Sequence, residues 1–207
     1  KGFRLPLGIR CSVIKINGPA AVSSRGAYLK DNLNAARSSV SWPRNSNERE
    51  HMIKPGTPAP AFTLPALAGG EWTLADQRGR VVALLFYPGN ETLVCTKQLC
   101  SVRDNWERYL ATGAEIVGIS PGTLDQHSSF AARHALPLNL LADEGRRITG
   151  EYVKHPIWPI WTTRGIVVID AEGVVRFSDV MLRAFRPTDD EVLAEIHLAR
   201  YDRLTTK

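Results

Sequence analysis

Cysteine is scarce in this chain of 207 residues, which has only Cys11, Cys95 and Cys100. Three cysteines are too few for a disulfide framework, and such usage fits a reducing compartment, where a cysteine is more often catalytic than structural. Long apolar runs are also missing, since none approaches the roughly 20 residues of a membrane-spanning helix. The sequence therefore indicates a cytoplasmic protein that has neither a disulfide framework nor a membrane segment.

Motifs for binding phosphates and metals are missing as well. The scattered glycines form no phosphate-binding loop and no nucleotide motif. His127, His134 and His155 have no spacing with one another that is typical of metal ligands. We therefore expect neither a bound organic cofactor nor a metal.

Positive charge is concentrated at one end of the chain. Residues 1–51 hold nine Lys and Arg against three Asp and Glu, whereas residues 52–207 hold 17 against 18. The nearly neutral main part gives no electrostatic reason to expect nucleic-acid binding. The first 51 residues also lack periodicity and are rich in Ser, Asn, Gly and Arg, so we expect a poorly ordered extension before a domain over residues 52–207.

The origin of this N-terminal extension is open at this point. Met52 begins a stretch typical of a natural start, so residues 1–51 are expected to be an inert tail or an error of gene prediction. The alternative is a transit peptide to an organelle, because such peptides are rich in Arg and Ser and poor in acidic residues. Cys11 lies in the extension, and we expect it to be incidental.

From residue 52 onwards, strand-like and helix-like patterns alternate. The expected strands cover residues 61–64, 71–74, 81–87, 114–119, 138–141, 165–170 and 174–179, and the first two form a hairpin. The expected helices cover residues 95–110, with Leu99, Val102, Trp106 and Leu110 on one apolar face, and residues 123–134. A last helix follows Thr188, which forms a capping box with Glu191. This order predicts a single α/β domain.

The most informative stretch lies between the apolar strand over residues 81–87 and the helix that follows it. Pro88 and Gly89 end the strand, and Cys95 lies where we expect the helix to begin. The positive end of the helix dipole favours a thiolate over a thiol, and only the thiolate is nucleophilic. Cys95 is therefore the candidate reactive group, with the Thr92 hydroxyl and the Cys100 sulfur nearby.

The pattern Pro88-x-x-x-Thr92-x-x-Cys95 is similar to the active-site signature of the peroxiredoxins (AhpC/TSA family), which reduce hydroperoxides on a thioredoxin-like fold. Cys100, five residues later, resembles the resolving cysteine of the peroxiredoxin Q branch, also called bacterioferritin comigratory protein. Arg164, directly before the apolar run over residues 165–170, matches the active-site arginine of the family. The resemblance extends from residue 54 to residue 196.

The resemblance implies a three-layer thioredoxin-like fold, with a central mixed sheet flanked by helices and an N-terminal hairpin. It implies a thiol-dependent peroxidase that reduces hydrogen peroxide and alkyl hydroperoxides and needs no cofactor. Cys95 would attack the peroxide and become a sulfenic acid, which Cys100 would resolve as a disulfide. A thioredoxin-type reductant would then restore the thiols, and the resemblance favours a monomer.

The other site residues have roles that suit this chemistry. Arg164 would keep Cys95 ionised and donate hydrogen bonds to the peroxide oxygens. Thr92 would donate to the sulfur or accept from the peroxide, and Pro88 would shield the pocket from water. We expect Trp158 and Trp161 to pack in the core, with a wall of the substrate pocket as the alternative for one of them.

Helix geometry separates the two cysteines of the motif. Five residues along a helix place two Cα atoms about 8–9 Å apart, beyond the roughly 7 Å that a disulfide allows. The start of the helix must therefore unwind before Cys95 and Cys100 can join. We expect oxidation to melt part of residues 95–103.

One position departs from the family pattern. A Glu often follows the reactive cysteine by three residues, and here Gln98 takes its place, with Glu91 as another carboxylate nearby. Gln retains hydrogen bonding but has no charge, so we expect a slower or retuned site. The departure supports one alternative function, a redox sensor that signals through a Cys95–Cys100 disulfide.

Further alternatives stay open at this point. One is a disulfide oxidoreductase acting on proteins, although four residues separate the two cysteines instead of the two of a Cys-x-x-Cys motif. Others are that Cys95 is an inert core thiol, since free cysteine is often buried, and that Cys100 only packs in its helix.

Overall fold

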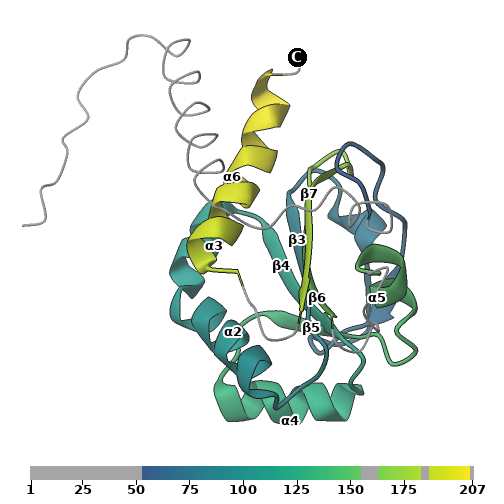
Figure 1. Ribbon diagram of the computed structural model, residues 1–207, viewed down its shortest axis with the longest axis vertical. Helices are drawn as coiled ribbons and strands as arrows, with labels where there is room; N and C mark the ends of the chain where they lie inside the picture. The colour runs from purple at the N-terminus through teal and green to yellow at the C-terminus, as the bar shows by residue number, and fades with distance from the viewer. Residues whose placement is uncertain (1–52, 155–162, 183–186, 206–207) are drawn as a thin grey trace, which may run out of the picture. The chain divides into compact units, whose positions relative to one another are not determined.

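The computed structural model describes residues 53–154, 163–182 and 187–205, with a five-stranded mixed sheet at the centre (Figure 1). Its strands are β3 (Val82–Phe86), β4 (Glu115–Ser120), β5 (Asn139–Ala142), β6 (Thr163–Ile169) and β7 (Val175–Leu182), in the order β5-β4-β3-β6-β7. The first three are parallel, and β6 runs antiparallel to both β3 and β7. Each overlaps a strand expected from the sequence, so the α/β prediction is confirmed.

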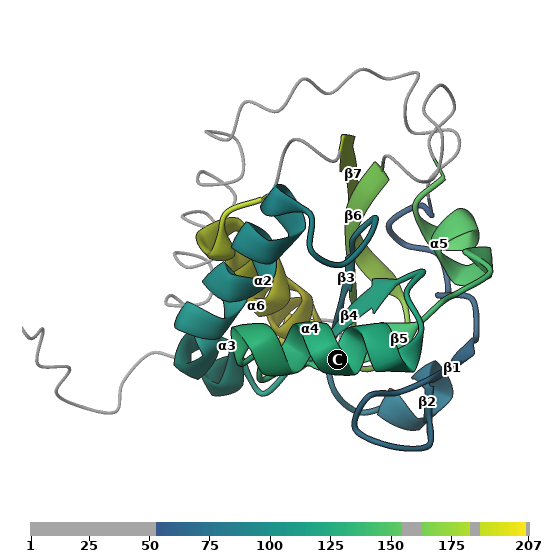
Figure 2. The ribbon, with the colours of Figure 1, turned by 90° about the horizontal axis from the view of Figure 1, so that it is seen from below.

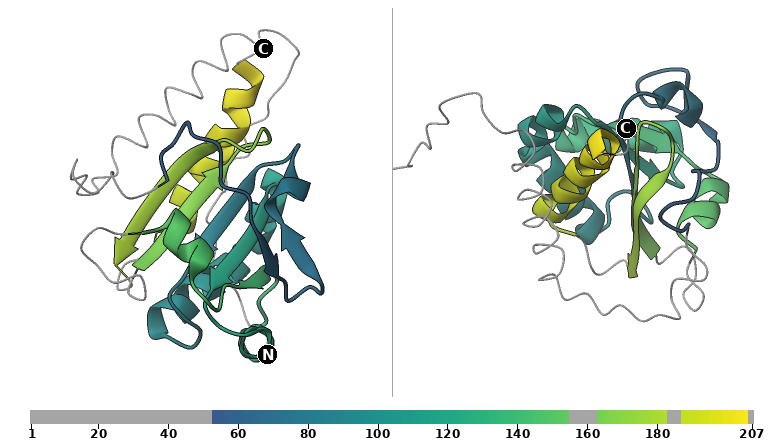
Figure 3. Two further views of the ribbon diagram at one scale, coloured as in Figure 1. Left: turned by 90° about the vertical axis from the view of Figure 1, so that its right-hand side faces the viewer. Right: turned by 90° about the horizontal axis from the view of Figure 1, so that it is seen from above.

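Helices cover both faces of the sheet, which gives the expected three layers (Figures 2 and 3). One face carries α2 (Leu93–Asp104), α3 (Trp106–Thr112), α4 (Leu124–His134) and α6 (Asp189–Thr205). The other face carries α5 (Arg147–Tyr152) and an N-terminal hairpin. In the left view of Figure 3, α5 lies in front of the sheet and α6 behind it.

The central strand β3 contributes to both hydrophobic cores. All five of its residues are buried, and successive side chains point to opposite faces of the sheet. Ala83 and Leu85 pack on the side of α2 and α6, whereas Leu84 and Phe86 pack on the side of α5. The continuous apolar run in the sequence is therefore that of a strand covered on both faces.

The N-terminal hairpin is present as predicted. It consists of β1 (Thr63–Pro65) and β2 (Glu71–Thr73), and the short 3₁₀ helix η2 (Leu74–Gln77) follows it. Trp72 of β2 packs against Phe62, with ring centroids 5.5 Å apart, in the core on the α5 side of the sheet.

The single helix expected over residues 95–110 is wrong, because α2 ends at Asp104 and α3 begins at Trp106. Asn105 lies between them, and its side chain donates to the carbonyl oxygen of Ser101 and to Asp189 Oδ2, both at 3.1 Å. Such side-chain bonds to nearby backbone compete with a continuous helix. The break turns Leu110 outward, where it is 53% exposed, and buries Tyr109 instead.

Helix ends follow the sequence more closely than helix interiors do. Thr188 and Glu191 form the expected capping box at the start of α6, and Thr123 forms one with Gln126 at the start of α4. The sequence did not predict α5, because six residues are too few to show a helical period. Its buried Ile148 instead fixes it against the sheet.

Several expectations concern residues outside the described ranges. They include the poorly ordered extension with Cys11, and Trp158 and Trp161. The domain boundary at residue 52 therefore stays a prediction. Within the described ranges, no helix is long and apolar enough to cross a bilayer, and no group of three or more His, Cys, Asp or Glu side chains is placed to hold a metal ion.

Candidate active site

The segment after β3 leads directly into the helix that carries both cysteines. Thr92 is the N-cap residue of α2, and its Oγ1 accepts a hydrogen bond from the backbone N–H of Cys95 at 3.4 Å. The helix starts at Leu93, so Cys95 lies within its first turn and not at its first residue as expected. The N–H of Cys95 is one of the donors that no helical carbonyl can satisfy, and the Thr92 side chain satisfies it.

Arg164 reaches the sulfur through the pairing of β3 with β6. The antiparallel register places Phe86 opposite Gly165, so Arg164 lies at the carboxyl end of β3, where the connection to α2 begins. Arg164 and Cys95 are both fully buried, and Arg164 Nη2 donates a hydrogen bond to Cys95 Sγ at 3.1 Å. Buried charges are less screened than exposed ones, so this guanidinium acts strongly on the sulfur.

Gln98 holds the other terminal nitrogen of the same guanidinium. It lies three residues after Cys95, on the same face of α2, and is 3% exposed. Its Oε1 accepts a hydrogen bond from Arg164 Nη1. Gln98 therefore orients Arg164 without bringing a negative charge to it, which an acidic residue at this position would do.

We expect Gln98→Ala to slow the oxidation of Cys95 about tenfold, a barrier change of about 1.4 kcal/mol, because Arg164 loses the group that orients it. The free energy of unfolding should fall by about 1–3 kcal/mol, since a buried N–H loses its acceptor. Stopped-flow fluorescence with hydrogen peroxide and urea denaturation measure the two effects. Gln98→Glu keeps an acceptor for Arg164 but adds a negative charge, so it separates the effect of orientation from that of charge. Equal rates for Gln98→Ala and the natural protein would contradict the orienting role.

The remaining residues of the motif are placed less tightly. Pro88 lies two residues after the end of β3 and is partly exposed, and Cys100 is partly exposed on α2. Both Cys95 and Cys100 are free thiols. Because α2 is helical throughout, their Cα atoms are about 8–9 Å apart, too far for a disulfide. The structure thus brings together Thr92, Cys95 and Arg164, and leaves Cys100 one and a half turns away.

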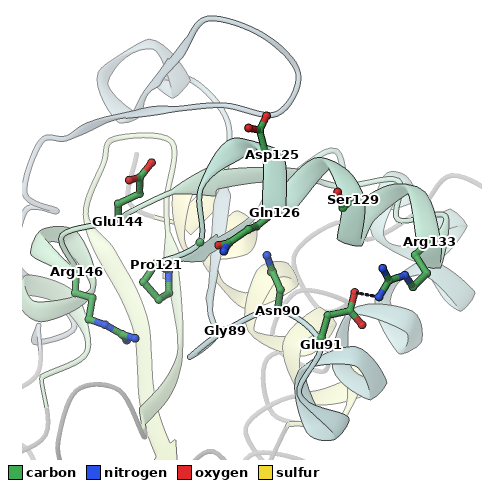
Figure 4. Close-up of a pocket in the computed structure, with 11 residues that line it drawn as sticks. Gly89, Asn90, Glu91, Pro121, Asp125, Gln126, Ser129, Arg133, Glu144 and Arg146 are labelled. Atoms are coloured by element: carbon green, nitrogen blue, oxygen red, sulfur yellow. Dashed lines mark ion pairs between the residues drawn. The ribbon is translucent and has the colours of Figure 1, made fainter.

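Glu91 pairs with side chains of α4. Its Oε1 pairs with Arg133 Nη1 at 2.8 Å (Figure 4). Its Oε2 lies 3.5 Å from His134 Nε2. Glu91 is also one of three non-glycine residues with a positive φ, at 60°, among the residues described. This carboxylate therefore anchors the loop between β3 and α2, from Pro88 to Thr92, to α4. It does not replace an acidic residue at position 98.

A partly buried hydrogen-bond network that includes Asn90 was not expected from the sequence. Tyr87 donates to Asn90 Oδ1 at 3.1 Å, and Asn90 Nδ2 lies 3.0 Å from His127 Nδ1. Burial raises the pKa of the Tyr87 phenol and lowers the pKa of His127, so both are neutral at neutral pH. No local pattern could reveal the network, because His127 is 37 residues away from Asn90.

A cavity of about 610 Å³ lies beside the loop (Figure 4). Its walls come from the loop at Gly89–Glu91, from Pro121 and Gly122 after β4, from α4, and from Glu144 and Arg146 after β5. Residues that follow parallel strands meet at the carboxyl edge of the sheet, which is where ligands bind in open α/β sheets. Cys95 itself does not line this cavity.

Comparison with known proteins gives a consistent result. Residues 55–178 match the AhpC/TSA family. The chain is 37% identical over 139 residues to a chloroplastic peroxiredoxin Q of Sedum lineare, covering 67% of this chain and 75% of that protein. It is 38% identical over 126 residues to the chloroplastic peroxiredoxin Q of Triticum aestivum, covering 60% of this chain and 58% of that protein.

A solved structure agrees with these relatives. The crystal structure of the peroxidoxin BcpB from Mycobacterium tuberculosis matches with a TM-score of 0.61 at 28% identity, over 72% of this chain and 98% of that one. The thioredoxin-like fold and the peroxiredoxin Q resemblance expected from the sequence are thereby confirmed. The chain belongs to the AhpC/TSA family.

Proposed function

We propose that this protein is a thiol-dependent peroxidase in which Cys95 reduces hydroperoxides. The observation that carries the proposal is the 3.1 Å hydrogen bond from the buried Arg164 to Cys95 Sγ, formed between residues 69 positions apart. An inert core thiol has no need of a buried guanidinium, because burying a charge is costly unless the charge has a use or a partner. Family membership supports the same activity.

The first step is attack of the Cys95 thiolate on the nearer peroxide oxygen. The S–O bond forms while the O–O bond breaks, and the departing oxygen leaves as an alkoxide or hydroxide that takes up a proton. Cys95 becomes a sulfenic acid, so the sulfur is oxidised by two electrons and the peroxide is reduced by two. Arg164 would stabilise the charge that moves from the sulfur to the departing oxygen, because it is already in place before the reaction.

The second step is resolution by Cys100. Its sulfur attacks the sulfenic acid of Cys95, a disulfide forms, and water leaves. A dithiol reductant of the thioredoxin type then exchanges with the disulfide, takes the oxidising equivalents and restores both thiols. We propose hydrogen peroxide and alkyl hydroperoxides as substrates, and a monomer as the working form.

Oxidation should unwind α2 as far as Cys100 and leave the chain from Asn105 through α3 folded. Asp189 accepts hydrogen bonds from Ser101, from Asn105 at 3.1 Å and from Tyr109 at 2.8 Å, so it anchors the chain beyond Cys100. We therefore expect amide protection on peroxide treatment to fall over residues 93–100 and to persist over residues 105–112. The expectation from sequence reached to residue 103, and the Asp189 contacts shorten it.

Hydrogen–deuterium exchange before and after one equivalent of peroxide measures this change. Cys100→Ser is the matched control, because it forms the sulfenic acid but no disulfide with Cys95 and should keep its protection. Unchanged exchange over residues 93–100 in the oxidised natural protein would rule out the internal disulfide.

The direct test of the proposed function is peroxide consumption with thioredoxin, thioredoxin reductase and NADPH. The natural protein should turn over repeatedly, whereas Cys100→Ser should react once at an undiminished rate and then stall. Slow oxidation with a large structural change would instead favour the redox sensor. Oxidation by protein disulfides but not by peroxides would favour the disulfide oxidoreductase.

The cellular compartment is a separate proposal. Both relatives are named as chloroplastic, which supports the transit-peptide alternative for residues 1–51 over the cytoplasmic expectation. We propose that this segment directs the protein to an organelle. Fusion of residues 1–51 to a fluorescent protein tests it, and diffuse cytoplasmic fluorescence would contradict it.

A further inference from the structure

The hydrogen bonds beneath the loop form a chain in which each group has one consistent role. Tyr87 donates its hydroxyl proton to Asn90 Oδ1, so the amide nitrogen of Asn90 is the end that faces His127. His127 Nδ1 must then be the unprotonated ring nitrogen, because an amide nitrogen only donates. The ring proton is on Nε2, which lies 3.1 Å from the carbonyl oxygen of Leu141.

Packing holds the same groups together. His127 is fully buried, and a Cβ added at Gly122 would lie 2.7 Å from His127 Cε1 and 3.0 Å from Asn90 Nδ2. At position 122, only glycine leaves enough space for the side chains of His127 and Asn90 to contact each other. Figure 4 shows the Asn90 side chain extending from the loop toward the first turn of α4, where Gln126 lies.

The network connects the loop to two strands of the sheet, β3 and β5, and to helix α4. Tyr87 directly follows β3, His127 belongs to α4, and Leu141 belongs to β5. Two residues after Asn90, Thr92 caps α2 and accepts the hydrogen bond from the Cys95 N–H. A shift of Asn90 would therefore move the cap, and with it the first turn that holds the sulfur near Arg164.

We infer that Asn90, held by Tyr87 and by neutral His127, is a positioning residue that sets the loop from Pro88 to Thr92 so that Cys95 meets Arg164. The inference rests on the proposed peroxidase function and deepens it. It assigns Asn90 no contact with the peroxide, since Asn90 acts only through the loop and its cap.

Acid should release the loop. A proton on His127 Nδ1 would face the Asn90 amide, donor against donor, and break the contact. Burial, the largest effect, lowers the pKa of His127, while hydrogen bonds to Leu141 and Ser120 and the Glu144 charge after β5 oppose it. The Tyr87 phenol is the titratable group on the β3 side. Because the pKa in the folded protein is below its ordinary value, the contact is intact at neutral pH and is lost as the pH falls through the lowered pKa.

The test compares rate constants for oxidation of Cys95 by hydrogen peroxide from neutral to acidic pH. Asn90→Ala should be about 10-fold to 100-fold slower at neutral pH, the scale expected for a misplaced reacting group. The natural protein should show a decrease whose midpoint equals that of His127 in an NMR titration. Asn90→Ala should lack this component and keep only the decrease that any thiolate nucleophile shows in acid. Gly122→Ala, which separates the same two side chains by crowding, should resemble Asn90→Ala.

Two variants serve as controls. Ser129 lines the same cavity but does not belong to the network, so Ser129→Ala should behave as the natural protein does. His134→Gln removes the other histidine near the loop, the one beside Glu91, and should retain the acid-dependent decrease. A purely structural role of Asn90 would lower the melting temperature of Asn90→Ala and leave the rate of the folded protein unchanged, which would overturn the inference.

A second readout separates this inference from the proposed function. If the natural protein consumes no peroxide, the proposed function fails, but the alkylation of Cys95 by iodoacetamide, located by mass spectrometry, still reports how the sulfur is held. An altered alkylation rate in Asn90→Ala, together with a component of the pH dependence that follows His127 in the natural protein and is missing from the variant, would support the positioning role. Equal alkylation of the two proteins at every pH would overturn it.

Discussion

Cys95→Ser is expected to reduce peroxide consumption to the level of the buffer. A serine hydroxyl is not ionised near neutral pH and is a weak nucleophile without a neighbouring base, so attack on the O–O bond stops. The fold should tolerate the change, because serine is of similar size and its oxygen can accept the hydrogen bond that Arg164 donates to Cys95 Sγ at 3.1 Å. Peroxide loss in the thioredoxin-coupled assay and far-UV circular dichroism check the two expectations.

The matched control for this result is Cys11→Ser, which changes a cysteine far from the motif in sequence and should leave turnover unchanged. Residual turnover in Cys95→Ser that disappears in Cys95→Ser/Cys100→Ser would mean that Cys100 is the attacking sulfur. In that case the order of the two cysteines proposed above would be reversed.

Arg164→Gln is expected to slow the oxidation of Cys95 by about 10²–10³-fold, the loss that follows removal of one preorganised donor to a developing charge. The glutamine can still donate a hydrogen bond but brings no positive charge to the sulfur or to the departing oxygen. Arg164→Lys keeps the charge but cannot hold Cys95 and Gln98 at once, because it lacks the planar fork of the guanidinium. Its rate should fall between the other two.

The stability of these variants needs its own measurement, since Arg164 is fully buried. Thermal unfolding followed by near-UV circular dichroism shows which of them are folded at the assay temperature. Arg80→Gln is the matched control, because Arg80 is about half exposed and pairs with Glu115 at 3.1 Å outside the site. A folded Arg164→Lys or Arg164→Gln with the natural rate would show that the guanidinium has no part in the reaction.

The elements that could be predicted from the sequence share one property, namely that their signal is local. The apolar run around β3, the turn at Pro88 and the capping box at Thr188 depend on neighbours within a few residues. The motif from Thr92 to Cys95 is of the same kind, because an N-cap and the N–H it accepts are three residues apart. For these features the sequence alone was sufficient.

The errors came from places where a distant residue changes a local pattern. The apolar face expected to reach Leu110 is interrupted because Asn105 bonds to Asp189, which lies 84 positions later. Similarly, His127 showed no metal-ligand spacing and had no further signal, although it contacts Asn90 in the loop before α2. Packing and hydrogen bonding between elements outweigh helical periodicity in such cases.

The sequence by itself determined the α/β class, the helix that carries Cys95 and Cys100, and the pattern by which the family could be identified. Only the tertiary structure decided how the site is assembled. The antiparallel pairing of β6 with β3 brings Arg164 to the Cys95 sulfur. The contact of Asn90 with His127 fixes the loop between β3 and α2. The physical reason is that contacts between residues close in the sequence depend on the local pattern alone. Contacts between distant residues form only after the pairing of the strands has set their register.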